Sequence, residues 1–211
     1  MMGPVRSATH IFSRDTTIME HFKGKIYMFR QYREDLGFII KNMPRFIRAS
    51  RNKKIPRSFV EKIMLVVTAV NGCRYCSWFH AKQALSSGMT GQEIREILDL
   101  QFHANASDHE VPALLYAQNY AETDRNPDRE VSDRLIGYYG DRTAEDITLY
   151  IRAIFFGNLT GNTFDAFLSR LRGVKAENSV PAFELFFFLL NFPVLFPLFL
   201  FLKKKTGAAR S

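Results

Sequence analysis

Apolar residues recur at helical spacing along almost the whole chain. Residues 18–33 and 34–50 both show this pattern, and Pro44 is expected to interrupt or bend the second of them. Another apolar stretch, residues 63–70, follows Ser58 and Glu61, which have the form of a capping box. No run of alternating apolar and polar residues is long enough for a sheet. The pattern therefore predicts an all-α fold.

Further helices are predicted in the second half of the chain, each bounded by a cap or a turn. Asn71-Gly72 ends one helix, and the next begins near Cys73 and runs to about Ser86, with Gly88 as a plausible C-cap. A capping box at Thr90 and Glu93 opens a helix that reaches Phe102. The remaining predicted helices cover residues 111–123, 131–139, 143–158 and 160–171.

Residues 182–202 differ from all the preceding sequence. Eight of them are Phe, and the 18 residues that follow Glu184 carry no charge. A helix of that length spans about 27 Å, close to the thickness of the hydrocarbon core of a bilayer. Because Asn191, Pro193 and Pro197 disfavour a straight span, a re-entrant or interfacial segment fits at least as well. We expect a membrane-associating tail, and burial in an oligomer interface is the alternative.

Charge is distributed unevenly over the 211 residues, whose net charge is +8. Residues 1–62 hold 14 Lys or Arg and 5 Asp or Glu, whereas residues 63–202 hold 11 and 16, and three lysines follow directly at 203–205. Such basic ends are often only solvated surface. Beside an apolar tail they also favour an anionic membrane surface as a partner. No helix-turn-helix or aromatic RNA-binding pattern accompanies them, so we expect no nucleic-acid partner.

These patterns divide the chain into three expected parts. Residues 1–54 form a basic helical extension, residues 55–175 a helical domain, and residues 182–202 the tail. Residues 1–20 lack the apolar segment of a secretory signal peptide. We therefore expect the protein on the cytoplasmic side of a membrane, peripheral or anchored through its C-terminal tail, with a soluble cytoplasmic protein as the alternative.

Cys73 and Cys76 are the only two cysteines, and with His80 they form a Cys-x-x-Cys-x-x-x-His segment. In a helix these three residues lie on one face. A disulfide between such close neighbours closes too small a loop to hold a fold together, so the pair is more plausibly reactive or metal-binding. Structural zinc needs four ligands, and neither His103 nor His109 has a ligand spacing. A thioredoxin motif needs a preceding strand, which the helical pattern does not provide. We expect neither a metal nor a cofactor.

The same residues resemble a known family. The resemblance rests on Pro56-Arg57-Ser58-Phe59-Val60-Glu61, about ten apolar residues, then Asn71-Gly72-Cys73-Arg74-Tyr75-Cys76-x-x-x-His80 and Gly88-Met89-Thr90-x-x-Glu93-Ile94. These segments are similar to the carboxymuconolactone decarboxylase superfamily, and most to its alkylhydroperoxidase D branch. The resemblance covers about residues 55–172. It implies a helical protomer that forms trimers or hexamers and reduces hydroperoxides, with an external lipoyl or thioredoxin-like dithiol as the reductant.

Carried over to this sequence, the resemblance assigns Cys76 the attack on the peroxide and Cys73 the resolution of the sulfenic acid. It assigns His80 and Glu61 a proton relay. For Glu61 the alternative is a capping role alone, with Ser58. An imidazole and a helix N-terminus near the thiols both favour the thiolate, so we expect a lowered thiol pKa.

The chain departs from the peroxidase branch at Tyr75, where that branch can carry a second histidine. This departure concerns the relay and substrate choice rather than the fold. Trp78 and Phe79 are expected in the core or in a pocket wall. The decarboxylase branch does not use this cysteine pair, so its presence argues against lactone chemistry. The rival hypothesis is a non-catalytic, membrane-associated assembly subunit with a redox-responsive cysteine pair.

Overall fold

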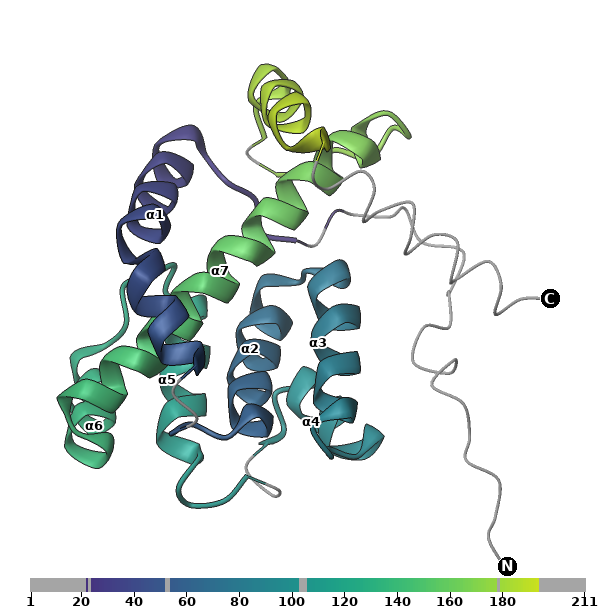
Figure 1. The fold of residues 1–211 in the computed structure, drawn as a ribbon. Helices are drawn as coiled ribbons and strands as arrows, with labels where there is room; N and C mark the ends of the chain where they lie inside the picture. The colour runs from purple at the N-terminus through teal and green to yellow at the C-terminus, as the bar shows by residue number, and fades with distance from the viewer. Residues whose placement is uncertain (1–21, 23, 52–53, 103–105, 178, 194–211) are drawn as a thin grey trace, which may run out of the picture.

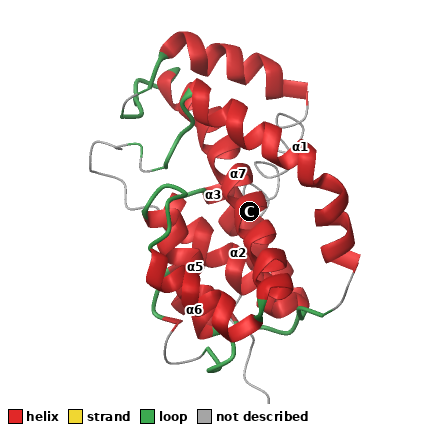
Figure 2. Cartoon of the chain, turned by 90° about the vertical axis from the view of Figure 1, so that its left-hand side faces the viewer, coloured by secondary structure: helices red, strands yellow, loops and turns green. Residues whose placement is uncertain are grey.

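The described part of a computed structural model, residues 22, 24–51, 54–102, 106–177 and 179–193, contains helices and no strand (Figures 1 and 2). The prediction of an all-α fold is confirmed. The helices are α1 Phe29–Arg51, α2 Arg57–Asn71, α3 Arg74–Ser86, α4 Gly91–Leu98, α5 Val111–Glu122, α6 Arg129–Tyr139 and α7 Asp141–Arg170, and residues 181–193 form one more.

Helix α2 lies at the centre of the fold, in contact with α3, α4, α5 and α7. Ile63, Leu65, Val66 and Val67 are fully buried around its circumference. A helix that is apolar on all sides is stable only when other helices cover it, which explains this central position. The residues at the two ends of α2 are therefore held by the core.

Helix capping agrees with the sequence at α4 and differs at α2. The Thr90 side chain accepts from the Glu93 N–H, and Glu93 Oε2 accepts from the Thr90 N–H at 2.7 Å, which confirms that capping box. The box predicted at Ser58 is wrong, because α2 is capped by Pro56 without a side-chain hydrogen bond. Helix α4 also ends at Leu98, before Phe102.

Helix α1 is a single helix where two segments were predicted. It begins only at Phe29, after non-helical residues 24–28, and it continues through Pro44. Proline removes one backbone hydrogen bond from the carbonyl four residues earlier. Because Pro44 and Ile40 are both exposed, water can satisfy that carbonyl, and the helix need not end. Of the predicted segment 18–33, residues 18–21 and 23 lie outside the described part.

Helix α7 is also continuous, although two helices, 143–158 and 160–171, were predicted, with polar residues on both sides of the gap between them. These side chains bind other segments instead of ending their own helix. Asn158 accepts from the Thr68 hydroxyl at 3.1 Å, and Asn162 donates to the Asn71 carbonyl at 2.8 Å. The result is a 30-residue helix that runs diagonally across the fold (Figure 1).

The first part of the Phe-rich tail packs onto the domain. Figure 1 shows the helix of residues 181–193 beside the C-terminal end of α7. Phe187 and Glu184 are fully buried, and the Glu184 carboxylate binds the Arg170 guanidinium at 2.5 Å. The ring of Phe188 stacks on that of Phe164 with 4.8 Å between centroids. The predicted tail from residue 194 onward lies outside the described residues.

Within the residues that the structure describes, none of the helices has the length and apolar character needed to cross a bilayer.

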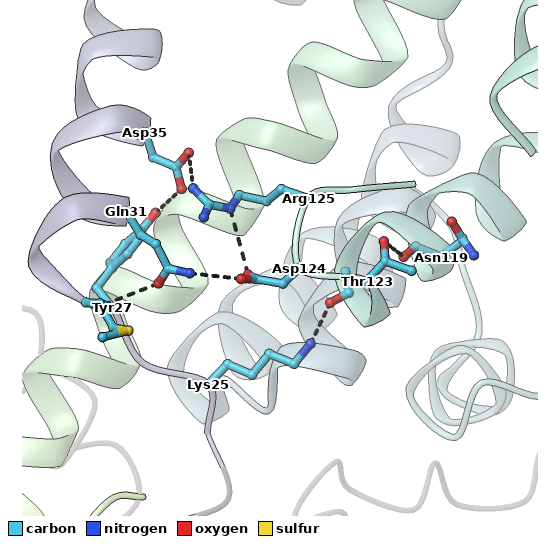
Figure 3. A network of polar contacts seen from close by, with 10 residues as sticks. Lys25, Tyr27, Gln31, Asp35, Asn119, Thr123, Asp124 and Arg125 are labelled. Atoms are coloured by element: carbon cyan, nitrogen blue, oxygen red, sulfur yellow. Dashed lines mark hydrogen bonds and ion pairs between the residues drawn. The ribbon is translucent and has the colours of Figure 1, made fainter. Parts of the chain in front are cut away.

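A polar network joins the start of α1 to the connection between α5 and α6 (Figure 3). Asp35 accepts from the Tyr27 hydroxyl and from Arg125 Nη1, each at 2.9 Å. Gln31 Nε2 donates to Asp124 at 2.8 Å, and Lys25 Nζ donates to a backbone carbonyl at the end of α5. These contacts fix α1 to the rest of the domain.

Candidate active site

The two cysteines lie where α2 turns into α3. Gly72 has φ +69° and ψ +32°, a left-handed conformation that glycine adopts without strain, and it ends α2. Cys73 then forms the N-cap of α3, with its Sγ accepting the Cys76 N–H at 3.4 Å. The turn that the sequence predicted at Asn71-Gly72 is confirmed, and it places both thiols at the N-terminus of a helix.

The two thiols differ in their access to solvent. Cys73 is fully buried, whereas Cys76 is half-buried, and both are free. A hydroperoxide therefore reaches Cys76 more easily than Cys73. This difference agrees with an order in which Cys76 reacts first.

The expected lowering of the thiol pKa is wrong for Cys76. Its hydrogen bond with the Cys73 thiol raises the pKa, and so do burial and the charge of a Cys73 thiolate. A backbone hydrogen bond opposes these effects without outweighing them. Because the thiolate is the nucleophile, Cys76 needs a base to take its proton.

Glu61 and His80 meet across α2 and α3. His80 Nδ1 lies 2.8 Å from Glu61 Oε2, and the two side chains are 12% and 8% exposed. The other carboxylate oxygen is 4.0 Å from the Arg57 guanidinium. With no capping box at Ser58, the capping alternative for Glu61 is excluded. The carboxylate instead holds the imidazole through Nδ1, and Nε2 is the ring nitrogen that Glu61 does not bind.

His80 does not bind the sulfurs directly in this structure. Among the described residues no hydrogen bond joins its ring to Cys73 or Cys76. His80 follows Cys76 by four residues, so the two side chains share one face of α3. A change of rotamer or a bridging water is needed to pass a proton between them, as is common in enzymes without bound substrate.

Helix α7 contributes residues that the sequence analysis missed. Asp165 Oδ1 accepts from Arg74 Nη2 at 2.5 Å and from the Tyr75 hydroxyl at 2.7 Å. Burial and the Asp165 carboxylate both raise the pKa of Tyr75, which therefore stays protonated. Gly161 lies beside the cysteines. The sequence feature that could have indicated these residues is the group of polar residues inside an otherwise apolar helix.

The other candidates have different surroundings. Phe79 is 45% exposed, so it does not lie in the core, one of the two locations expected for it. Trp78 is half-buried, with Lys82 Nζ 5.8 Å from its ring. His109 packs against Phe59 and Tyr139, while His103 lies outside the described residues. In the part of the chain that is described, no group of three or more His, Cys, Asp or Glu is arranged to hold a metal ion.

Comparison with known protein families gives a similarity over part of the chain. No curated protein matches the chain. Residues 42–122, from the last part of α1 to the end of α5, match the sequence model of the carboxymuconolactone decarboxylase family. This range includes Glu61, both cysteines and His80, but not α7. The chain thus contains, at residues 42–122, a domain similar to the carboxymuconolactone decarboxylase family.

Proposed function

We propose that the protein is a dithiol peroxidase of the alkylhydroperoxidase D type, which reduces organic hydroperoxides through Cys73 and Cys76. The observation that carries this proposal is the buried Glu61–His80 pair, at 2.8 Å, on the two helices that meet at the cysteines. A carboxylate that orients a histidine next to a thiol is the arrangement used to activate a nucleophile. The family match supports the proposal, because that family includes peroxidases of this type.

The proposed peroxidase reaction has three steps. The Cys76 thiolate attacks one peroxide oxygen, the O–O bond breaks, and the products are a Cys76 sulfenic acid and an alkoxide that takes up a proton. The Cys73 thiol then attacks the sulfenic sulfur, and the disulfide forms as water leaves. An external dithiol, lipoyl or thioredoxin-like, returns the pair to two thiols by exchange and becomes a disulfide itself.

His80 and Glu61 serve the first step in this mechanism. Because the pKa of Cys76 is raised, the thiol does not ionise readily at neutral pH without a base. In this mechanism Nδ1–H of a neutral His80 donates to Glu61, and Nε2 takes the proton. The imidazolium that forms is stabilised by the buried carboxylate and then protonates the leaving alkoxide.

The test separates the two thiols. Purified wild type, Cys76→Ser and Cys73→Ser are given cumene hydroperoxide with dihydrolipoamide, and the products on each cysteine are followed by intact-protein mass spectrometry. We expect Cys76→Ser to lose turnover, and Cys73→Ser to accumulate a sulfenic acid without a disulfide. Turnover by Cys76→Ser at the wild-type rate would refute the proposal. Absence of peroxidase and disulfide-exchange activity in the wild type, with stable incorporation into a larger complex, would favour the assembly subunit.

We further propose that the protein acts at an anionic membrane surface. The helix of residues 181–193 buries one face on the domain and exposes an apolar one, formed by Leu185, Phe186, Leu189 and Leu190. Further apolar residues and three lysines follow in the sequence. Exposed apolar surface beside basic residues is typical of interfacial binding, and it would bring lipid hydroperoxides within reach.

Sedimentation with vesicles tests the membrane proposal. Wild type should sediment with vesicles that contain phosphatidylserine, and Leu189→Glu should not. Ile136→Glu on α6, also at an exposed apolar residue, is the matched control and should bind like wild type. Wild type that stays in the supernatant would refute membrane binding. Light scattering would then show whether Leu189→Glu changes the oligomer, for which trimers or hexamers are our proposal.

A further inference from the structure

The middle of α7 holds the cysteine turn from both sides. On the α2 side, Asn162 donates to the Asn71 carbonyl at 2.8 Å. On the α3 side, Asp165 binds Arg74 and Tyr75, the two residues between the cysteines. Asn162 and Asp165 are only 3% and 7% exposed, so α7 makes both contacts from the interior of the fold. The backbone around the thiols is therefore positioned by one neighbouring helix.

Gly161 lies on the same face of α7, one turn before Asp165, and against the sulfurs. A Cβ at this position would be 3.2 Å from Cys73 Sγ, 3.9 Å from Cys76 Sγ and 3.9 Å from the Tyr75 ring. The distance to Cys73 Sγ is shorter than an ordinary van der Waals contact, whereas the other two distances are within the ordinary range. Gly161 has an ordinary helical conformation, so the absent side chain matters here for space rather than for backbone freedom.

We propose that Gly161 is a positioning residue for the thiol pair, whose missing side chain leaves the space in which the sulfurs of Cys73 and Cys76 move together to form a disulfide. This inference deepens the proposed function, but its geometry applies to any oxidant that joins the two thiols. Asp165 complements this role, because it holds Arg74 and Tyr75, the residues between the cysteines, while the sulfurs move.

The physical reason is the change of geometry when the disulfide forms. The two sulfurs must approach to about 2.05 Å with a dihedral angle near 90°, so at least one cysteine has to rotate. A methyl group at residue 161 would press on Cys73 Sγ and limit that rotation. A Cys76 sulfenic acid would then persist, and a second hydroperoxide would transfer an oxygen to it, giving a sulfinic acid and an alcohol.

Two alanine variants of the full chain test the proposal. Gly157 stands one turn earlier on α7, and a Cβ there meets nothing within 4 Å, so Gly157→Ala is the matched control for Gly161→Ala. Both substitutions raise helix propensity to the same degree. Thermal unfolding followed by circular dichroism checks that both variants fold, and Gly161→Ser provides a second variant at the crowded position.

The first measurement uses diamide, which needs no peroxidase activity. One thiol adds to its N=N bond, and the other thiol displaces the reduced hydrazine product as the disulfide forms. In Gly161→Ala we expect the second step to slow by about tenfold or more, the effect of overpacking a filled site, so the adduct accumulates in mass spectra. Gly157→Ala should match wild type. Equal rates in wild type, Gly161→Ala and Gly161→Ser would overturn the inference.

The second measurement replaces diamide with cumene hydroperoxide. Gly161→Ala should yield more sulfinic acid at Cys76 than wild type or Gly157→Ala, at the same excess of peroxide. If wild type forms the disulfide with diamide but never with hydroperoxide, the proposed peroxidase function fails. The diamide result still decides the role of Gly161 in that case, so the two failures are distinguishable.

Discussion

The molecule buries two carboxylates equally well and gives them different partners. Glu61, between α2 and α3, is paired with His80, and Asp35, on α1, is paired with Arg125. The two carboxyl side chains are 8% and 9% exposed, so burial does not distinguish them. The partners do, because an imidazole can accept and release a proton whereas a guanidinium keeps its charge.

The surroundings of the two pairs reinforce this difference. Asp35 also accepts from the Tyr27 hydroxyl, and its network joins three segments (Figure 3). Asp124 and Arg125 adopt left-handed backbone conformations, φ +51° and +73°, to enter it. Glu61 instead binds one ring nitrogen of His80, which shares a face of α3 with Cys76, and among the described residues no hydrogen bond to the other ring nitrogen is found. One pair is suited to hold helices together and the other to move a proton.

The largest expected effect is on the rate when His80 becomes glutamine. Loss of a positioned base should lower the rate of peroxide-driven disulfide formation by about 10²–10⁴-fold, the usual contribution of general acid–base catalysis. Stopped-flow measurement of thiol oxidation checks this. Arg125→Gln is the comparison variant, and per folded molecule it should react like wild type. A His80→Gln protein that oxidises at the wild-type rate would remove the relay from the mechanism.

The next effect is on stability when Asp35 becomes alanine. Removing Asp35 takes away the closer partner of the Arg125 guanidinium and leaves only Asp124, at 3.7 Å, so the cost should approach that of a broken buried ion pair, about 3–5 kcal/mol. Urea denaturation should show this loss in the free energy of unfolding. The folded fraction should keep its thiol reactivity. If reactivity is lost while stability is kept, the division between a structural and a chemical pair is wrong.

A smaller effect concerns the pH dependence of Cys76. Since the pKa of Cys76 is raised, the rate of its alkylation by iodoacetamide should rise about tenfold per pH unit. This rise should continue at pH values where an ordinary thiol is already ionised. Cys73→Ala removes the first cause of the shift, so Cys76 should react faster at a fixed pH. The raised pKa also stabilises the folded state at low pH. This contribution to the free energy of unfolding is lost as the pH rises through the pKa of Cys76 in the folded protein. An unchanged alkylation profile in Cys73→Ala would contradict this explanation.

The smallest effect distinguishes pairing from capping at Glu61. Ser58→Ala should change the free energy of unfolding by less than about 0.5 kcal/mol, as for a surface residue without a special role. Thr90→Ala, which removes a real capping box, should cost about 1 kcal/mol. Thermal denaturation of both variants makes the comparison. A Ser58→Ala loss as large as that of Thr90→Ala would return Glu61 to a capping role.

Several features were predictable from the sequence because they depend on neighbours in the chain. The all-α class, the end of α2 at Gly72 and the Thr90–Glu93 box follow from periodicity and capping. The pairing of Glu61 with His80 was expected from the resemblance alone, because the two residues lie on different helices. The box at Ser58 failed since the same residue types also fit the interior of a first helical turn.

The contributions of α7 and of the tail were not predictable in this way. Nothing local distinguishes Gly161 from Gly157, the other glycine of α7, and only its approach to Cys73 Sγ gives it a role. The break predicted in α7 is wrong, because the polar residues around it bind partners that are remote in sequence. Glu184 similarly appeared as the last charge before an apolar tail, whereas it is fully buried against Arg170.

The sequence by itself determined that this protein is helical and that two thiols, an imidazole and a carboxylate are its candidate chemistry. Tertiary structure decided that Glu61 holds the imidazole and does not cap α2, which thiol is more accessible to solvent, and in which direction the pKa of Cys76 moves. The physical reason is that hydrogen bonding and desolvation depend on groups brought together from distant segments. Periodicity and capping depend only on residues within a few positions of one another.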